Sequence, residues 1–270
     1  AGDQRAAQDL PQRGDVALYC AELLNKWAAA SPEYSKEIVM RAAEYSVEAV
    51  DIMRSLYDGA PGDDGAKFKY STALYWKGLN LATLCRLGGA PDGRWTTQQA
   101  YDLAHASLTD CEALRADATE EVKAEVIFAQ GVLAFCKAEA VNSGFLRSTK
   151  MEKSVLVDRK FRQALRLFDQ AYQLWSSSYG DKHLETVKAI TMIGILQHRL
   201  AGAQAGLEWC RKELRIREEL QGEMHPRTQQ TRRTYTMLLD EKLQAERREG
   251  PAAAAAAATA AAVAAPASSV

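Results

Sequence analysis

Apolar residues recur at intervals of three and four along almost the whole of this 270-residue chain. That spacing gathers them on one face of an α-helix, whereas the period-two alternation typical of strands is nearly absent. The pattern therefore predicts an all-α fold. We expect helices at residues 14–30, 33–57, 66–88, 96–115, 118–141, 158–179, 184–201, 203–221 and 227–248.

Local signals mark where several of these helices begin. Ser31 stands directly before a proline, which favours a helix start because the hydroxyl accepts an otherwise unpaired amide hydrogen bond. Thr96 with Gln99, and Asp117 with Glu120, have the spacing of a capping box. We therefore expect a helix to start beside each of these residues.

Glycine and proline mark where helices end. Gly180 and Gly222 each follow an amphipathic run, where glycine takes the left-handed conformation that ends a helix. Residues 58–65, DGAPGDDG, are expected to form a loop, and residues 142–157 to form an insertion. The alanine-rich residues 251–270 begin with a proline that should end the last helix. We expect a disordered tail or linker there, because alanine lacks the bulk to build a core.

An internal repeat of 42 residues is the most informative pattern in the sequence. Gly180 and Gly222 are 42 residues apart, and so are His183 and His225. Superposing the two copies also aligns apolar residues: Leu165 on Leu207, Leu167 on Trp209, Tyr172 on Leu214 and Leu174 on Ile216. We infer two copies of one helical unit, each ending in the same glycine turn.

The second copy resembles a known repeat. Residues Leu214–Pro226 read LRIREELQGEMHP, which is similar to the end of the second helix and the following turn of kinesin-light-chain-type tetratricopeptide repeats. Gly194 stands where the first helix of such a repeat carries the small residue that packs on the second helix. Gly206 stands where the second helix carries its usual alanine. The resemblance is strong over residues 159–240.

Upstream the resemblance weakens. Over residues 66–141, Gly78 and Gly131 are the candidate equivalents of Gly194, but the connections between helices are longer than in the family. Residues 1–57 show only the character of a helical hairpin. A generic helical bundle with one accidental duplication therefore remains the alternative fold.

The resemblance implies an α-α superhelix, that is, a solenoid of stacked helical hairpins with a disordered alanine-rich tail. On this interpretation residues 1–157 form divergent N-terminal hairpins. Residues 158–250 form clear tetratricopeptide-like repeats with a capping helix, and residues 251–270 form the low-complexity tail.

The resemblance also implies a function, because such repeats bind a partner peptide or helix in a concave groove. Counted from Gly194, the groove residues implied here are Lys188, Thr191, Ile195, His198, Arg199, Gln230, Arg233 and Met237, with Asp240 at the end of the same face. The sequence departs from the family at the groove asparagines that hold the bound peptide's backbone, where Thr191 and Met192 stand instead. The asparagine of the carboxylate clamp is also missing.

Charge and motifs narrow the function classes further. The formal net charge is −1, and the sequence pI is about 6.5. An acidic pI, with no regular pair of base-reading residues in each repeat, argues against nucleic acid. No run of 18 residues has the bulk to span a bilayer, so we expect no membrane insertion. The metalloprotease, dinucleotide-binding, phosphate-binding and serine-hydrolase motifs are all missing, so we expect no enzyme, catalytic residue, metal or cofactor.

The cysteines point to a reducing compartment. They number five, lie far apart and form no CxxC pair, so neither a disulfide framework nor a zinc site is expected. The cytoplasm fits this pattern. The chain starts at Ala1 without a methionine, so a removed targeting segment remains a second expectation.

Three function classes stay open at this stage. The first is a scaffold or adaptor that binds a partner protein or peptide in its groove, and we favour it. The second is a structural subunit of a large multiprotein assembly, with the groove permanently filled. The third, an RNA-binding helical repeat, is disfavoured by the charge.

Overall fold

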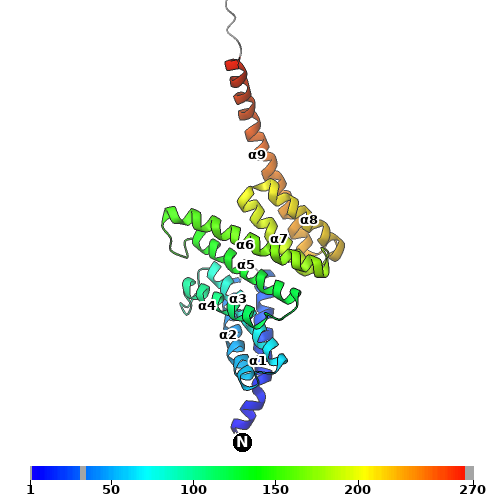
Figure 1. The fold of residues 1–270 in the computed structure, drawn as a ribbon. Coiled ribbons are helices and arrows are strands. Elements are labelled where there is room, and N and C mark those ends of the chain that lie inside the picture. The colour runs from blue at the N-terminus through cyan, green and yellow to red at the C-terminus, as the bar shows by residue number, and fades with distance from the viewer. Residues whose placement is uncertain (1, 31–34, 265–270) are drawn as a thin grey trace, which may run out of the picture. The chain divides into compact units, whose positions relative to one another are not determined.

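The computed structural model describes residues 2–30 and 35–264, and helices are the only regular secondary structure in those ranges (Figure 1). This confirms the all-α prediction. The helices are α1 (Gly2–Ala30), α2 (Ser35–Gly59), α3 (Asp64–Arg86), α4 (Thr97–Leu114), α5 (Glu120–Asn142), α6 (Lys150–Tyr179), α7 (Leu184–Ala201), α8 (Ala203–Gln221) and α9 (Pro226–Ala264). Most bounds fall within about two residues of those expected, the usual precision of sequence patterns.

The start of α6 corrects one prediction. Residues 142–157 were expected to form an insertion, but α6 begins at Lys150. Thr149 and Glu152 form a capping box, in which the Glu152 amide donates to the Thr149 hydroxyl at 3.3 Å. The box satisfies two amides of the first turn, so the helix starts eight residues earlier than expected.

The two terminal helices are also longer than expected. α1 begins at Gly2, not at residue 14, and it continues through Pro11. α9 continues through Pro251 to Ala264, so the prediction that Pro251 ends the helix and that the alanine-rich residues form a disordered tail is wrong as far as residue 264. A proline inside a helix removes one hydrogen bond, whereas alanine has the highest helix propensity of all residues.

The expected caps have mixed outcomes. Thr96 and Gln99 form the predicted capping box. Asp117 and Glu120 do not, because the helix begins at Glu120 itself and its N-cap is Thr119, which makes no side-chain cap hydrogen bond. The predicted cap at Ser31 lies outside the described residues.

The loop predicted at residues 58–65 is shorter in the structure. α2 runs to Gly59 and α3 starts at Asp64, so only four residues separate the two helices. Asp63 is the N-cap of α3, and its carboxylate accepts a hydrogen bond from the Gly65 amide at 2.8 Å. This cap lets the second helix begin inside the glycine-rich stretch.

The glycine turns of the 42-residue repeat are confirmed. Gly180 follows α6 with φ +81°, and Gly222 follows α8 with φ +80°. Each glycine amide donates to the carbonyl four residues earlier, at 3.0 Å and 3.1 Å. The Nδ1 atoms of His183 and His225 each accept a hydrogen bond from the backbone amide two residues onward, at 3.3 Å and 3.2 Å. The two copies therefore share one turn geometry, as the sequence pattern predicts.

The chain packs as two compact units, Ala1–Ala189 and Ile190–Val270. The division falls inside α7. It reflects packing and does not locate repeat boundaries, so the domain division at 157/158 stays a prediction. Among the residues that the structure describes, no helix is both long and apolar enough to cross a membrane.

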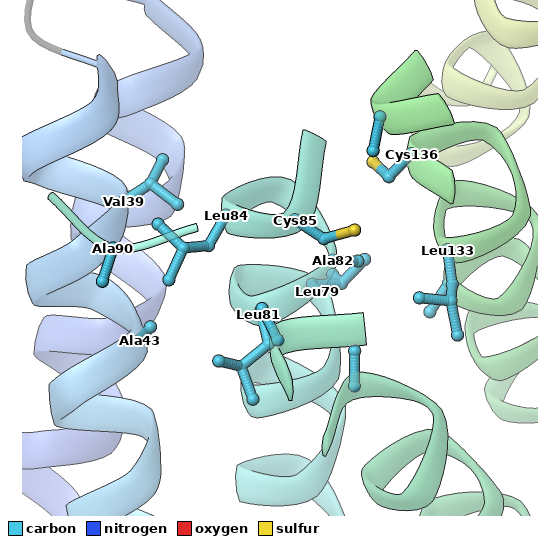
Figure 2. Close-up of a cluster of buried hydrophobic side chains, with 14 of the residues drawn as sticks. Val39, Ala43, Leu79, Leu81, Ala82, Leu84, Cys85, Ala90, Leu133 and Cys136 are labelled. Carbon is cyan, nitrogen blue, oxygen red and sulfur yellow. The ribbon is translucent and has the colours of Figure 1, made fainter. Parts of the chain in front are cut away.

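The core of the first unit centres on α3. Leu81 and Leu84 are fully buried there and lie toward Val39 of α2, while Leu133 of α5 approaches from the other side (Figure 2). Many of the remaining residues of this core are alanines: Ala28, Ala43, Ala82, Ala90, Ala100, Ala104, Ala129 and Ala140. Such small side chains let helix backbones approach closely, so the core is built mainly from tight helix contacts.

Glycines mark the closest of these contacts. A Cβ atom at Gly78 of α3 would lie 2.6 Å from the Cγ atom of Leu108 in α4. One at Gly131 of α5 would lie 2.8 Å from the ring of Phe168 in α6. Both glycines were the candidate small residues of upstream hairpins, and the structure places each against the following helix. The close packing is confirmed, and its assignment to tetratricopeptide repeats stays a prediction.

We predict that Gly78→Val destabilises the protein by about 2 kcal/mol, because added carbons would overlap the buried Leu108 side chain in a packed core. Gly62→Val is the matched control, since nothing lies within 4 Å of a Cβ atom at that position. The free energy of unfolding from urea titration is the measurement. Equal stability of the two variants would contradict the close contact of α3 with α4.

Candidate functional site

A cavity of about 400 Å³ lies among α7, α8 and α9 in the second unit. We call it the α7–α9 pocket. Its lining residues are Thr191, Gly194, Ile195, His198, Arg199, Gly206, Cys210, Glu213, Arg217, Arg227, Gln230, Thr231, Thr234, Met237 and Leu238. A cavity of this size with mixed apolar and polar walls is within the range of ligand and peptide side-chain pockets.

Most of the groove residues expected from the sequence meet in this pocket. α7 contributes Thr191, Ile195, His198 and Arg199, and α9 contributes Gln230 and Met237. Helical spacing explains the agreement, since residues three and four apart share a face. That these residues bind a partner stays a prediction.

Two expected groove residues lie elsewhere. Arg233 does not line the pocket, but borders a shallow depression on α9 of about 710 Å³ together with Met237 and Asp240. Lys188 belongs to the first unit, and its ammonium group pairs with the Glu185 carboxylate at 2.6 Å, one turn earlier on the same helix.

Two glycines form the narrow part of the pocket wall. A Cβ atom at Gly206 of α8 would lie 2.6 Å from the Cβ atom of His198 on α7. One at Gly194 would lie 3.2 Å from the Cβ atom of Trp209. Gly194 of α7 therefore faces α8, and Gly206 of α8 faces α7. This confirms the close packing expected at Gly194 and at Gly206.

A buried ion pair forms another part of the wall. The Nε atom of Arg217 donates to Oε1 of Glu213 at 2.7 Å, and the two side chains are only 13% and 8% exposed. The Thr231 hydroxyl of α9 donates to the same oxygen at 3.1 Å, and Arg217 also donates to the Thr191 hydroxyl at 3.4 Å. The network therefore links α7, α8 and α9 at one point. A buried charge needs such partners, because removal from water is costly.

Sequence reasoning missed this ion pair, although the repeat contained a signal for it. Positions 42 residues before Glu213 and Arg217 hold Ala171 and Trp175, which are fully buried in the first unit. Two charged residues therefore occupy positions that the earlier copy fills with apolar side chains. A polar change at a buried repeat position indicates a specialised contact.

Among the described residues, Cys210 is the one cysteine that lines the pocket, and its thiol is unreactive. Cys210 is buried, and its thiol lies 3.7 Å from the carbonyl oxygen of Thr231 as a weak donor. Burial raises the pKa of the Cys210 thiol to about 12, and the nearby carboxylate of Glu213 adds to the shift. The thiol is therefore protonated at neutral pH and lacks the thiolate character of a nucleophile.

The charges at the pocket mouth are mainly positive. Three arginines, Arg199, Arg217 and Arg227, line the pocket together with one carboxylate, Glu213, which pairs with Arg217. His198 contacts Glu241 on α9 at 3.0 Å, which ties α7 to α9 at the rim. Ile195 and Met237 are 37% and 55% exposed and give the mouth an apolar surface. Cations beside exposed apolar groups suit a ligand that carries a carboxylate next to an apolar side chain.

We predict that Glu213→Ala destabilises the protein by about 3 kcal/mol, because it leaves the Arg217 charge buried without its carboxylate. Glu213→Ala with Arg217→Met should lie within about 1 kcal/mol of the wild type, since an apolar pair removes both charges. Glu208→Ala, an exposed site on the same helix, should change stability by less than about 0.5 kcal/mol. Chemical denaturation checks all three, and a mild effect of Glu213→Ala alone would show that the pair is dispensable.

Comparison with known proteins gives little further guidance. No family model matches the chain, and no solved structure matches it. A stretch of 88 residues is 40% identical to the decarboxylating 6-phosphogluconate dehydrogenase 2, chloroplastic, of Oryza sativa subsp. japonica. That stretch covers 33% of this chain and 16% of the dehydrogenase. A similarity confined to such small parts of both proteins shows no family and does not establish an enzyme.

Proposed function

We propose that this chain is a non-catalytic scaffold that binds a peptide or helix of a partner protein in the α7–α9 pocket. The observation that carries the proposal is the meeting of six predicted groove residues in one cavity, four from α7 and two from α9. The resemblance of residues 159–240 to tetratricopeptide repeats supports it, as does the shared turn geometry at Gly180 and Gly222. A solenoid of stacked hairpins is part of the same proposal.

The pocket chemistry defines the partner more closely. Arg227 is exposed at the pocket, and within the described residues its guanidinium makes no ion pair. Ile195 and Met237 supply apolar contact beside it. The matching ligand is a short segment in which an Asp or Glu lies next to a Leu, Ile or Phe, because the carboxylate pairs with arginine and the apolar side chain fills the cavity.

The polar groups buried in the pocket wall make contacts that stabilise the fold. This supports a binding role for the pocket over a catalytic one. Glu213 and Arg217 form an ion pair with each other, and Glu213 also accepts a hydrogen bond from Thr231 of α9. The Cys210 thiol is protonated through burial. The groups that face the open mouth are the rim cations and apolar side chains, and such groups recognise a ligand without transforming it.

We predict that selection from a random peptide library on the immobilised full chain enriches peptides with an acidic residue beside a large apolar one. Arg227→Glu should weaken binding of a selected peptide at least about tenfold, because charge reversal repels the carboxylate. Arg215→Glu is the matched control, since it makes the same charge change at an exposed position of α8 outside the pocket. Calorimetric titration gives both affinities.

Two outcomes would contradict the proposal. One is a library that yields no enriched motif, and the other is equal peptide affinity in the Arg227→Glu and Arg215→Glu variants. The second function class is a structural subunit of a large assembly. Such a subunit would be purified with a partner protein already bound in its pocket. Native purification in one large complex, with no exchange against the selected peptide, would favour that alternative.

A further inference from the structure

The first helix carries a second apolar face that the described residues of its own unit leave exposed. Val16, Tyr19, Leu23 and Trp27 of α1 are 60%, 64%, 49% and 54% exposed, although all four are large hydrophobic residues. Single exposed apolar residues are ordinary on protein surfaces, but a contiguous group marks an interaction site. We call these four residues the α1 stripe.

Helix geometry shows that the α1 stripe is contiguous. At about 100° per residue, the four side chains fall within an arc of about 80° on one side of α1. The opposite side of the helix packs on the rest of the unit through Ala17, Ala21 and Ala28, each buried. α1 is therefore apolar on two sides, whereas a surface helix of a globular protein needs only one such side.

The charges along the stripe are cancelled within the chain. Arg13 pairs with Glu48 of α2, and Asp15 pairs with Lys69 of α3 at 2.8 Å. Glu22 and Lys26 pair with each other along α1. The borders of the stripe therefore present balanced ion pairs and no uniform field. A strongly acidic or basic partner finds no complementary patch there.

We propose that the α1 stripe binds the same stripe of a second copy of this chain, which makes the protein a weak two-fold dimer. A two-fold interface places one surface against itself, so it tolerates only a patch whose own charges do not repel their copies. The neutral borders of the stripe meet that condition. Tyr19 and Trp27 are of the residue types that carry most of the energy at protein interfaces.

The size of the stripe sets the strength of the dimer. Four large side chains that are half to two-thirds exposed present roughly 400–500 Å² per copy, or roughly 800–1,000 Å² over both copies. That area is at the lower limit for a specific interface, so we expect dissociation in the range of about 1–100 μM. The proposal is independent of the α7–α9 pocket, which lies in the other unit.

Sedimentation velocity over protein concentrations from about 1 to about 200 μM tests the proposal on the full chain. The wild type should shift from monomer to dimer as concentration rises. Tyr19→Glu with Trp27→Glu should remain monomeric throughout, because it places like charges face to face. Phe68→Glu is the control, since it puts the same charge at an aromatic residue of α3 that is 61% exposed and outside the stripe. Melting curves of the variants establish that each is folded.

Chemical cross-linking gives a second readout that needs no destabilising change. Cys20 is partly exposed and lies on the same side of α1 as the stripe, whereas Cys85, Cys111, Cys136 and Cys210 are buried. A short bis-maleimide linker should therefore join two chains, and Cys20→Ser should abolish the linked dimer. A wild type that stays monomeric at every concentration overturns the proposal. So does a dimer that persists in the Tyr19→Glu, Trp27→Glu variant.

Discussion

Close helix-to-helix contact through small side chains is the constraint on which the rest of this structure depends. Gly78, Gly131 and Gly206 each lie where a neighbouring helix leaves no space for a side chain. Alanines fill much of the remaining interface in the first unit. Dispersion and apolar burial act strongly at such short separations, so helices that meet through small residues pack firmly around the larger core side chains. Consecutive hairpins are built on this one type of contact.

Close helix contact also positions the polar residues that line the α7–α9 pocket in the second unit. Where the earlier copy of the repeat buries Ala171 and Trp175, the later copy has the buried Glu213 and the largely covered Arg217. The tight approach at Gly206 brings α7 and α8 together, and the ion pair then reaches Thr231 on α9. A pocket lined by all three helices results, in which Glu213 and Arg217 neutralise each other and Arg227 is exposed.

The local structure was largely available from the sequence, because helix caps and turns depend on residues a few positions apart. The capping box of Thr96 with Gln99 formed as expected, and Gly180 and Gly222 end their helices with positive φ. Where a helix bound differed from the one expected, another nearby feature of the sequence usually explains the difference. Thr149 capped α6 inside an expected insertion, and alanine propensity outweighed the proline at residue 251. The face of α7 that enters the pocket followed from the register that the repeat resemblance implies at Gly194, except for Lys188, which lies outside the pocket.

Tertiary structure decided which of these faces are covered. No spacing rule shows that Glu213 and Arg217 are buried together, because their burial depends on Thr231, which arrives from the next helix. Nor does the pattern of α1 show that its second apolar side stays exposed while Ala17 and Ala21 are packed. The sequence by itself determined the helices, their turns and the repeat, since those depend on neighbours along the chain. The α7–α9 pocket and the exposed side of α1 depend on residues that are neighbours in space, and those neighbours are set only when the helices pack.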